Sequence, residues 1–314
     1  MSPVPITSAL DSLPSPEDSN PGSPTSSSQS APLGYGNAEP AFTTNDSTLN
    51  SSDGINPSVN KIRRALESGR CSLGAWVMIP GTTVSRFMAG MGFDWIMVDG
   101  EHGHMDDRAI NDAVNSIAPW GVSPIIRLPG GDSWLIKRAL DTGAHGVMIP
   151  MVNTKEQAEA VVRGARFPPI GSRGHGGPFC TAAWKCNNAQ YVKSANDEIM
   201  VIVQIETREA LKNVEQIASV PGIDMLFVGP NDLAADMGFP PSSENYHPDV
   251  VAALEKIKAA ARAHDKYVGI WANDGASAAR RREQGFQMVS IGADIMAITG
   301  WYATEIGIAA GERK

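Results

Sequence analysis

The sequence predicts one parallel α/β barrel, a (β/α)8 TIM barrel, over residues 58–314. From about residue 61 onward, eight short apolar segments alternate with amphipathic helical stretches, which is the strand count of such a barrel. The length of 314 residues suits one barrel. Polar residues follow directly after several apolar segments, where barrels carry functional side chains. A doubly wound open sheet shares this alternation and is the alternative.

Residues 1–57 differ in composition from the rest of the chain. They are rich in Ser, Pro, Thr, Asn and Gly and contain no Lys or Arg. Such a segment cannot bury enough apolar surface to offset its loss of conformational entropy. It also lacks the features of a secretory signal or a mitochondrial presequence. We therefore predict a disordered tail without a catalytic role.

Each predicted strand is short, rich in apolar or β-branched residues and bounded by turn or helix signals. In order they are 73–79, 95–99, 124–128, 146–150, 200–206, 225–228, 268–272 and 288–291. Apolar residues at helical spacing predict the helices 84–91, 107–118, 133–141, 154–165, 208–218, 248–264 and 276–284. One more helix is expected near 63–66 and another at 302–309.

The charge and cysteine content exclude several classes of protein. The net charge is −8, from 34 acidic and 26 scattered basic residues, which argues against nucleic acid or an anionic membrane as the main partner. No apolar run approaches the roughly 20 residues that span a bilayer. Cys71, Cys180 and Cys186 are too few and too irregularly spaced for a disulfide framework, so we expect free thiols in the reducing cytoplasm.

Two carboxylates follow neighbouring predicted strands. Glu206 ends one apolar run, and Asp232 follows the next strand just beyond Gly229 and Pro230. Carboxyl ends of parallel strands meet at one edge, so these acids are expected to converge there. Carboxylate oxygens and water are the ligands that Mg²⁺ prefers. The alternative is that each acid only stabilises the N-terminus of a helix.

The loop after the second strand, Asp99-Gly-Glu-His102-Gly-His104, holds several acid–base groups. A histidine near a carboxylate can act as a general base near neutral pH. His102 and His104 also form a His-x-His pair of the kind that binds zinc in hydrolytic barrels. That alternative needs histidines at later strand ends, and none of the other four directly follows a late strand.

Three further residues are candidates for the site. Arg127 lies among isoleucines and leucine, so its buried guanidinium needs an anionic partner, either a substrate or a neighbouring acid. Asp141 ends a predicted helix, where an acid is unfavourable to the helix dipole, which indicates a specific partner such as His102. Trp76 is either a pocket wall or a core residue. The loop 167–179 is Gly-rich but lacks a dinucleotide fingerprint, and it suits a lid or an oligomer contact.

Several motifs together resemble the class II pyruvate aldolases of the HpcH/HpaI family. They are 95–102 (WIMVDGEH), 127–129 (RLP), 137–144 (KRALDTGA), 167–169 (FPP) with Arg173-Gly174, 204–207 (QIET) and 229–233 (GPNDL). They occur in order between about residues 61 and 308. Residues 80–84 (PGTTV) and 176–179 (GGPF) look closest to the fungal macrophomate synthase branch.

The resemblance implies a role for each residue. Glu206 and Asp232 would hold a divalent metal, Mg²⁺ first, with Mn²⁺ or Co²⁺ as alternatives. His102 would be the base, with Asp141 raising its basicity and Asp99 hydrogen-bonding within the site. Arg127 would stabilise an enolate, while Gln204, Asn231 and Asp232 would contact a 2-oxo acid. The family also implies a hexamer, a trimer of dimers, with the C-terminal helix 302–309 swapped between subunits.

The expected function is that of a metal-dependent carbon–carbon lyase acting through a pyruvate enolate. It would cleave a 4-hydroxy-2-oxo acid to pyruvate and an aldehyde, or decarboxylate oxaloacetate to the same enolate. No lysine lies at a late strand end, which disfavours a Schiff-base aldolase. Three alternatives stay open: a CoA-ester lyase of the malyl or citryl type, a macrophomate-synthase-like coupling of decarboxylation to attack on a pyrone, and a non-catalytic barrel.

Overall fold

A computed structural model describes residue 56 and residues 59–242 and 245–311. The chain divides into two units, Met1–Thr44 and Asn45–Lys314, and the second unit contains every described residue. The predicted disordered tail over residues 1–57 lies outside the described residues, Asn56 excepted, and stays a prediction.

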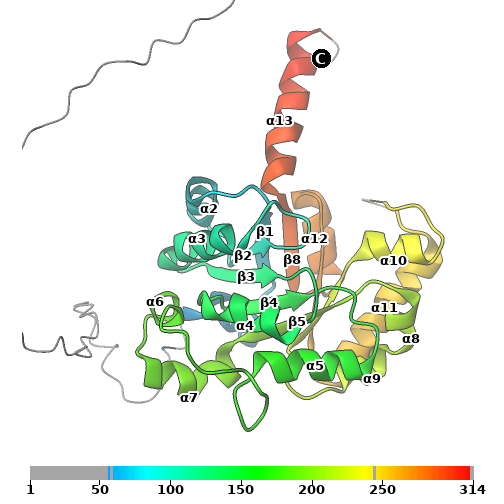
Figure 1. Cartoon of the computed structure of the whole chain (residues 1–314). Helices are drawn as coiled ribbons and strands as arrows, with labels where there is room; N and C mark the ends of the chain where they lie inside the picture. The colour runs from blue at the N-terminus through cyan, green and yellow to red at the C-terminus, as the bar shows by residue number, and fades with distance from the viewer. Residues whose placement is uncertain (1–55, 57–58, 243–244, 312–314) are drawn as a thin grey trace, which may run out of the picture. The chain divides into compact units, whose positions relative to one another are not determined.

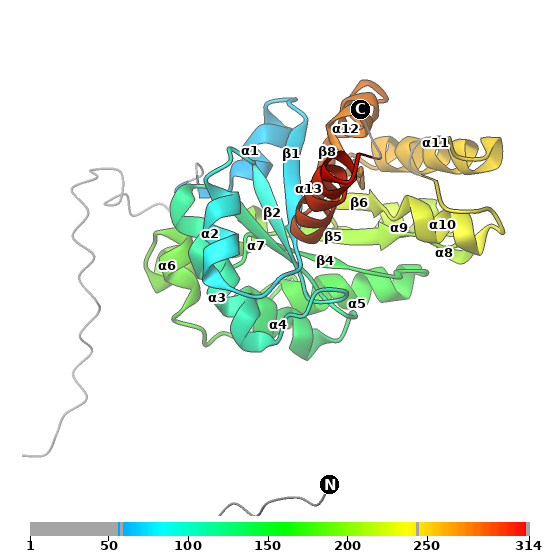
Figure 2. The ribbon, with the colours of Figure 1, turned by 90° about the horizontal axis from the view of Figure 1, so that it is seen from above.

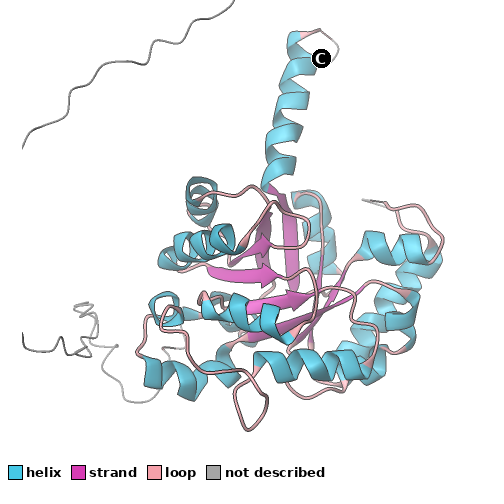
Figure 3. Ribbon diagram, viewed as in Figure 1, coloured by secondary structure: helices cyan, strands magenta, loops and turns pink. Residues whose placement is uncertain are grey.

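Eight parallel strands close into a barrel in chain order, with β8 paired to β1, so the predicted (β/α)8 fold is confirmed (Figure 3). The predicted strand positions are reproduced with ends that shift by two residues or fewer. The strands are β1 Ser72–Val77, β2 Trp95–Asp99, β3 Ser123–Arg127, β4 Gly146–Ile149, β5 Met200–Ile205, β6 Met225–Val228, β7 Tyr267–Ile270 and β8 Met288–Ala293.

Helices surround these strands, as the view from above in Figure 2 shows. They are α1 Lys61–Glu67, α2 Thr82–Ala89, α3 Asp107–Ile117, the 3-10 turn η3 Ala118–Trp120, α4 Ser133–Asp141, α5 Lys155–Ala165, α6 Cys180–Trp184, α7 Asn188–Glu198, α8 Arg208–Lys212, α9 Val214–Ala218, α10 Pro230–Asp236, α11 Pro248–Ala263, α12 Gly275–Glu283 and α13 Asp294–Ala309.

Large side chains fill the inside of the barrel. Trp95 is fully buried there, and Gly74 makes room for it, because a Cβ on Gly74 would lie 2.1 Å from the indole ring. Ile62 and Leu66 of α1 belong to the same interior cluster. The short helix before β1 therefore contributes apolar side chains to the barrel interior, which leaves the opposite, carboxyl end of the strands to form a pocket.

The helices differ from the prediction in five places. Helices α6, α7 and α10 were not predicted. The predicted helix 208–218 is split at Asn213, whose side-chain amide donates to the Asn153 carbonyl at 2.8 Å. The C-terminal helix begins at Asp294, eight residues before its predicted start at 302, because the apolar run after β8 continues directly into helix.

Helix α13 extends away from the barrel at the end where β8 finishes (Figure 1). Its large apolar side chains are exposed, namely Ile295, Met296, Ile298, Trp301, Tyr302, Ile306 and Ile308. A helix that is apolar on all sides is normally buried. Within the described residues, no helix is both long and apolar enough to cross a membrane.

His145 is a buried histidine at the start of β4, far from the carboxyl ends of the strands. Its ring nitrogens lie 3.2 Å from Ser123 Oγ and 3.3 Å from the Ala183 carbonyl oxygen. Burial lowers the pKa of His145 from 6.5 to about 4. At a pH between about 4 and 6.5 the unfolded chain binds a proton at His145 that the folded protein does not bind. Lowering the pH through this range therefore destabilises the fold.

We expect the free energy of unfolding to fall by roughly 3 kcal/mol through this one group as the pH drops from about 7 to 4. The measurement is urea unfolding across that range for the wild type, His145→Asn and the control His104→Asn, whose imidazole is exposed. The pH slope should shrink only in His145→Asn. An unchanged slope in that variant would show that His145 titrates normally.

Candidate active site

A pocket of about 240 Å³ lies at the carboxyl ends of the strands. It contains seven of the nine predicted site residues, contributed by β1, β2, β3, β5, the loop that follows β2 and the first turn of α10. These seven are Trp76, Asp99, His102, Arg127, Gln204, Asn231 and Asp232. Met78, Phe227, Trp271 and Met296 complete its apolar walls. The size suits a small organic acid.

Arg127 is held in place by the neighbouring strand. Its Nε and Nη2 donate to the two carboxylate oxygens of Asp99 at 2.9 and 2.7 Å, in the fork geometry of a bidentate ion pair. The strand register explains the pairing, because Asp99 and Arg127 are partners across β2 and β3. The guanidinium carbon of Arg127 lies 4.3 Å from the centroid of the Trp76 ring, which is a cation–π contact. Trp76 is thus both core and pocket wall.

Glu101 is a second acid on Arg127, and the sequence did not single it out as a site residue. Its Oε2 lies 2.9 Å from Arg127 Nη1 and 3.8 Å from His102 Nε2. His102 itself is exposed at the mouth of the pocket, with 64% of its side chain accessible. The signal in the sequence was the DGEH motif, where Glu101 follows the strand by two residues.

Glu206 is a buried carboxylate with two fixed hydrogen bonds. Its Oε1 accepts from the Met151 backbone N–H at 2.8 Å, and its Oε2 accepts from Gln204 Nε2 at 3.0 Å. The pKa of Glu206 is raised to about 7, mainly by burial and also by the negative charges of Asp232 and Glu101, while the Met151 N–H and the charge of Arg127 act to lower it. The alternative role as a helix cap is wrong for Glu206, because Thr207 caps α8.

Asp232 lies in the first turn of α10, with Gly229 as the N-cap. Its effect on the pKa of Glu206 means that the two carboxylates are close enough to repel one another. A bound cation would relieve that repulsion. Glu206 and Asp232 therefore fit a hard divalent ion that takes its remaining ligands from water and substrate oxygens. The described residues contain no group of three or more His, Cys, Asp or Glu placed to hold a metal.

Two buried polar atoms of the pocket residues lack partners within the described part of the chain. Gln204 Oε1 and Trp76 Nε1 are both inaccessible and make no hydrogen bond there. Because Gln204 already donates through Nε2 to Glu206, its oxygen is left to accept from something else. Such unsatisfied atoms are costly and mark places where a ligand or water binds. Asn231, by contrast, accepts from the Tyr246 hydroxyl at 2.9 Å, a contact that the sequence did not predict.

Asp141 is not near His102 within one chain. Helix α4 runs back from the end of β3, so its last residue lies at the amino end of the strands. There Asp141 accepts from Arg173 Nη2 at 2.9 Å. Among the described residues no hydrogen bond joins Asp141 to His102. The predicted dyad is therefore not formed within this chain.

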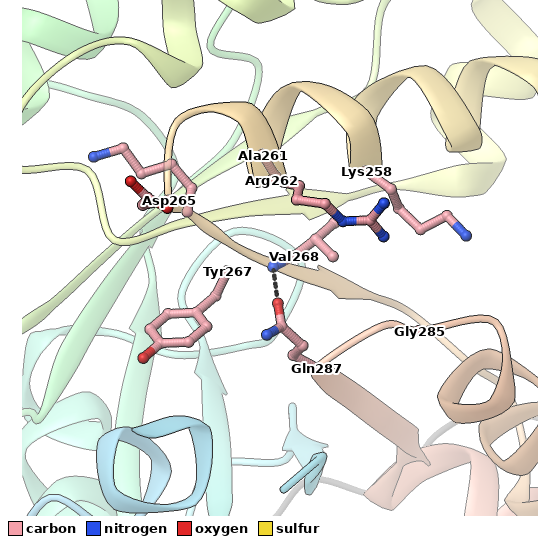
Figure 4. A pocket seen from close by; sticks show the side chains of 9 residues that line it. Lys258, Ala261, Arg262, Asp265, Tyr267, Val268, Gly285 and Gln287 are labelled. Atoms are coloured by element: carbon pink, nitrogen blue, oxygen red, sulfur yellow. Dashed lines mark hydrogen bonds between the residues drawn. The ribbon is translucent and has the colours of Figure 1, made fainter. Parts of the chain in front are cut away.

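A larger pocket, of about 380 Å³, lies at the opposite end of the barrel (Figure 4). It contains none of the predicted site residues. Arg262 and Lys258 of α11 line one side, and Lys258 Nζ is already bound to the Gln284 carbonyl at 2.7 Å. Gln287 accepts from the Val268 N–H at 3.1 Å. Asp265 is the one acid among its lining residues, and none of the buried side-chain polar atoms without a partner in the described part of the chain belongs to this pocket.

The cysteines are free and their pKa values argue against a nucleophile. Burial raises the pKa of Cys71 and Cys180, and it raises that of Cys186 to about 12. Thiols of this kind stay protonated and unreactive at neutral pH.

The site geometry agrees with what comparisons with known proteins show. A sequence profile described as HpcH/HpaI aldolase/citrate lyase matches residues 73–299. The chain belongs to this family. A 4-hydroxy-2-oxo-heptane-1,7-dioate aldolase of Escherichia coli is 37% identical over 235 residues, covering 75% of this chain and 89% of that protein.

Two further proteins extend the comparison. A 2-keto-3-deoxy-L-rhamnonate aldolase of Klebsiella pneumoniae is 38% identical over 240 residues, covering 76% of this chain and 89% of that protein. The crystal structure of macrophomate synthase superposes with a TM-score of 0.72 at 25% identity, covering 81% of this chain and 89% of that one. Aldolases at this identity over three quarters of the chain identify it as an aldolase-type lyase.

Gly229→Ala tests the predicted cation site without removing a ligand. A Cβ at this position would lie 2.3 Å from Glu206 Oε2, so the carboxylate must move. We expect affinity for Mg²⁺, measured by calorimetry, to fall between about 10- and 100-fold, as for other changes beside ligands. Gly130→Ala, with open space around the new Cβ, is the control. Equal Mg²⁺ affinity in both variants would contradict the assignment.

Proposed function

We propose that the protein cleaves a 4-hydroxy-2-oxo acid to pyruvate and an aldehyde, using a divalent cation held by Glu206 and Asp232, with Mg²⁺ as the first choice. The observation that carries this proposal is one small pocket lined by the fixed Arg127 and by Gln204, which donates a hydrogen bond to the buried, destabilised Glu206 behind it. Two relatives named as aldolases of 4-hydroxy-2-oxo and 2-keto-3-deoxy acids support the substrate class. Decarboxylation of oxaloacetate leads to the same enolate and would use the same residues.

The protein side chains divide the work between charge and proton transfer. Arg127, fixed by Asp99 and backed by Trp76, presents its remaining N–H groups to the oxygen where negative charge develops. Gln204 Oε1 is free to accept a hydrogen bond from bound substrate or water. His102, at the mouth of the pocket, removes the proton from the 4-hydroxyl group. When bound, the cation supplies Lewis-acid stabilisation of the enolate.

The alternatives are less well supported. A CoA thioester would have to extend beyond a pocket of about 240 Å³, and no observation of the site favours it. The macrophomate-like reaction shares the enolate and differs only in the electrophile that traps it. Aldolase relatives at 37–38% identity argue against a non-catalytic barrel. We place the enzyme in the cytoplasm because its three cysteines are free thiols.

Exchange of the methyl protons of pyruvate in D₂O tests enolate formation without choosing an aldehyde. We expect exchange with Mg²⁺, and a loss of about 100-fold on chelation or in Glu206→Gln, comparable to removing one electrostatic stabiliser of a transition state. Glu209→Gln, an exposed acid three residues away, is the control. Full exchange by Glu206→Gln in the presence of chelator would overturn the mechanism.

We further propose a homo-oligomer, a hexamer built as a trimer of dimers, in which α13 packs onto a second copy. The seven exposed apolar side chains of α13 support this, since one chain leaves them in water. The family resemblance suggests the same swap. A second copy would also offer a way to bring Asp141 to His102, because the two lie at opposite ends of one barrel.

Substitutions that place negative charges on α13 should dissociate the oligomer. We expect Trp301→Glu with Ile306→Glu, at positions 60% and 66% exposed, to reduce the mass measured by light scattering, while Glu283→Lys on α12 leaves it unchanged. An unchanged mass for the double variant would exclude α13 as the contact.

A further inference from the structure

Arg127 has two acidic partners that are bound very differently. Asp99 is fully buried and takes two of the guanidinium N–H groups. Its Oδ1 also accepts from the backbone N–H groups of Glu101 and His102 at 3.1 and 3.2 Å. Every oxygen of Asp99 is therefore engaged by groups that are themselves fixed, so this ion pair cannot open without disturbing the loop.

Glu101 is bound to the same guanidinium through one oxygen only. Its Oε2 lies 2.9 Å from Arg127 Nη1, and the side chain is 18% exposed. The same oxygen is 3.8 Å from His102 Nε2, so a small movement of the side chain would bring it to a second partner. Burial raises the pKa of the Glu101 carboxyl. The charges of Asp99 and Asp232 raise this pKa as well, whereas Arg127 and His102 act to lower it. The ionised carboxylate is thus poorly stabilised where it lies.

We propose that Glu101 is the exchangeable counter-ion of Arg127, which the carboxylate or enolate oxygen of the incoming 2-oxo acid displaces toward His102. The inference rests on the proposed function. Arg127 cannot move to meet the ligand, because Asp99 and the ring of Trp76 hold it on two sides. The exchange must therefore occur at Nη1, where Glu101 is the weaker and more exposed partner.

This exchange makes Glu101 a residue that determines specificity. While no substrate is bound, Glu101 occupies Nη1, the part of the guanidinium that Asp99 leaves open toward the pocket. A neutral ligand is too weak an acceptor to replace a carboxylate on Arg127, whereas an anionic ligand can. The negative charge of Glu101 also repels every anion that approaches. Glu101 therefore weakens the binding of all anions and favours those with the strongest acceptor at Nη1.

Glu101→Gln removes the competing charge and keeps the shape of the side chain. We expect calorimetry at saturating Mg²⁺ to show pyruvate and oxalate binding about tenfold more tightly to Glu101→Gln than to wild type, because a repulsive charge next to the ligand is lost. In the exchange assay KM for pyruvate should fall without a matching rise in kcat. Glu283→Gln, an exposed acid on α12, should match wild type.

Equal or weaker binding by Glu101→Gln would overturn the inference, and Glu101→Ala provides a second variant if the first does not fold. A crystal structure with oxalate gives an independent test: Glu101 should have left Nη1, and a ligand bound with that ion pair intact would refute the exchange. If wild type binds neither pyruvate nor oxalate with Mg²⁺, the proposed function itself fails. Unaltered affinity in the variant, with normal binding by wild type, rejects only the role of Glu101.

Discussion

The pocket gathers more negative charge than its own positive charge can offset, and the account of this protein depends on that imbalance. Asp99 and Glu101 pair with one guanidinium, that of Arg127, and the charges of Asp232 and Glu101 act on the buried Glu206. Asp99 is fully paired, but Glu206 is buried beside other acids, which raises its pKa to about 7. Burying unpaired carboxylates is costly unless a cation accompanies them. A divalent ion between Glu206 and Asp232 would turn this unfavourable arrangement into a site that stabilises a new negative charge on substrate.

The closed parallel barrel is what makes such a concentration of charge tolerable. Its interior is filled with large apolar side chains, which support the strands independently of the pocket. The strand register then sets individual contacts, as in the pairing of Asp99 with Arg127 across β2 and β3. Backbone N–H groups at the strand ends hold the acids in position, for example that of Met151 on Glu206. The rigid strands and their ends thus hold the charged groups in place. A charged group with few contacts, such as Glu101, can still change partners when a ligand binds.

Much of this arrangement could be predicted from the sequence, because strand periodicity is a local signal and the polar residues that follow strands converge in a barrel. The eight strands follow from that reasoning, and so do four pocket residues at strand ends, namely Asp99, His102, Arg127 and Asp232. Gln204 and Asn231 were implied only by the family resemblance, and Trp76 was left open between pocket wall and core. Asp141 was paired with His102 through family resemblance, although the direction of α4 places it at the other end of the barrel. The DGEH motif places Glu101 just past a strand end, but its contact with Arg127, like that of Tyr246 with Asn231, joins separate segments and is not encoded by a local pattern. Helix α10 was not among the predicted helices, although Asp232 was considered as an acid at a helix N-terminus and proline is well suited to the first turn of a helix.

The most direct test is a crystal of the full chain grown with Mn²⁺ and oxalate, analysed by anomalous scattering at the manganese absorption edge. The account predicts one strong anomalous peak between the carboxylates of Glu206 and Asp232, with oxalate oxygens completing the coordination and reaching toward Arg127. A peak elsewhere in the protein, or oxalate bound in the pocket with no cation between Glu206 and Asp232, would contradict it.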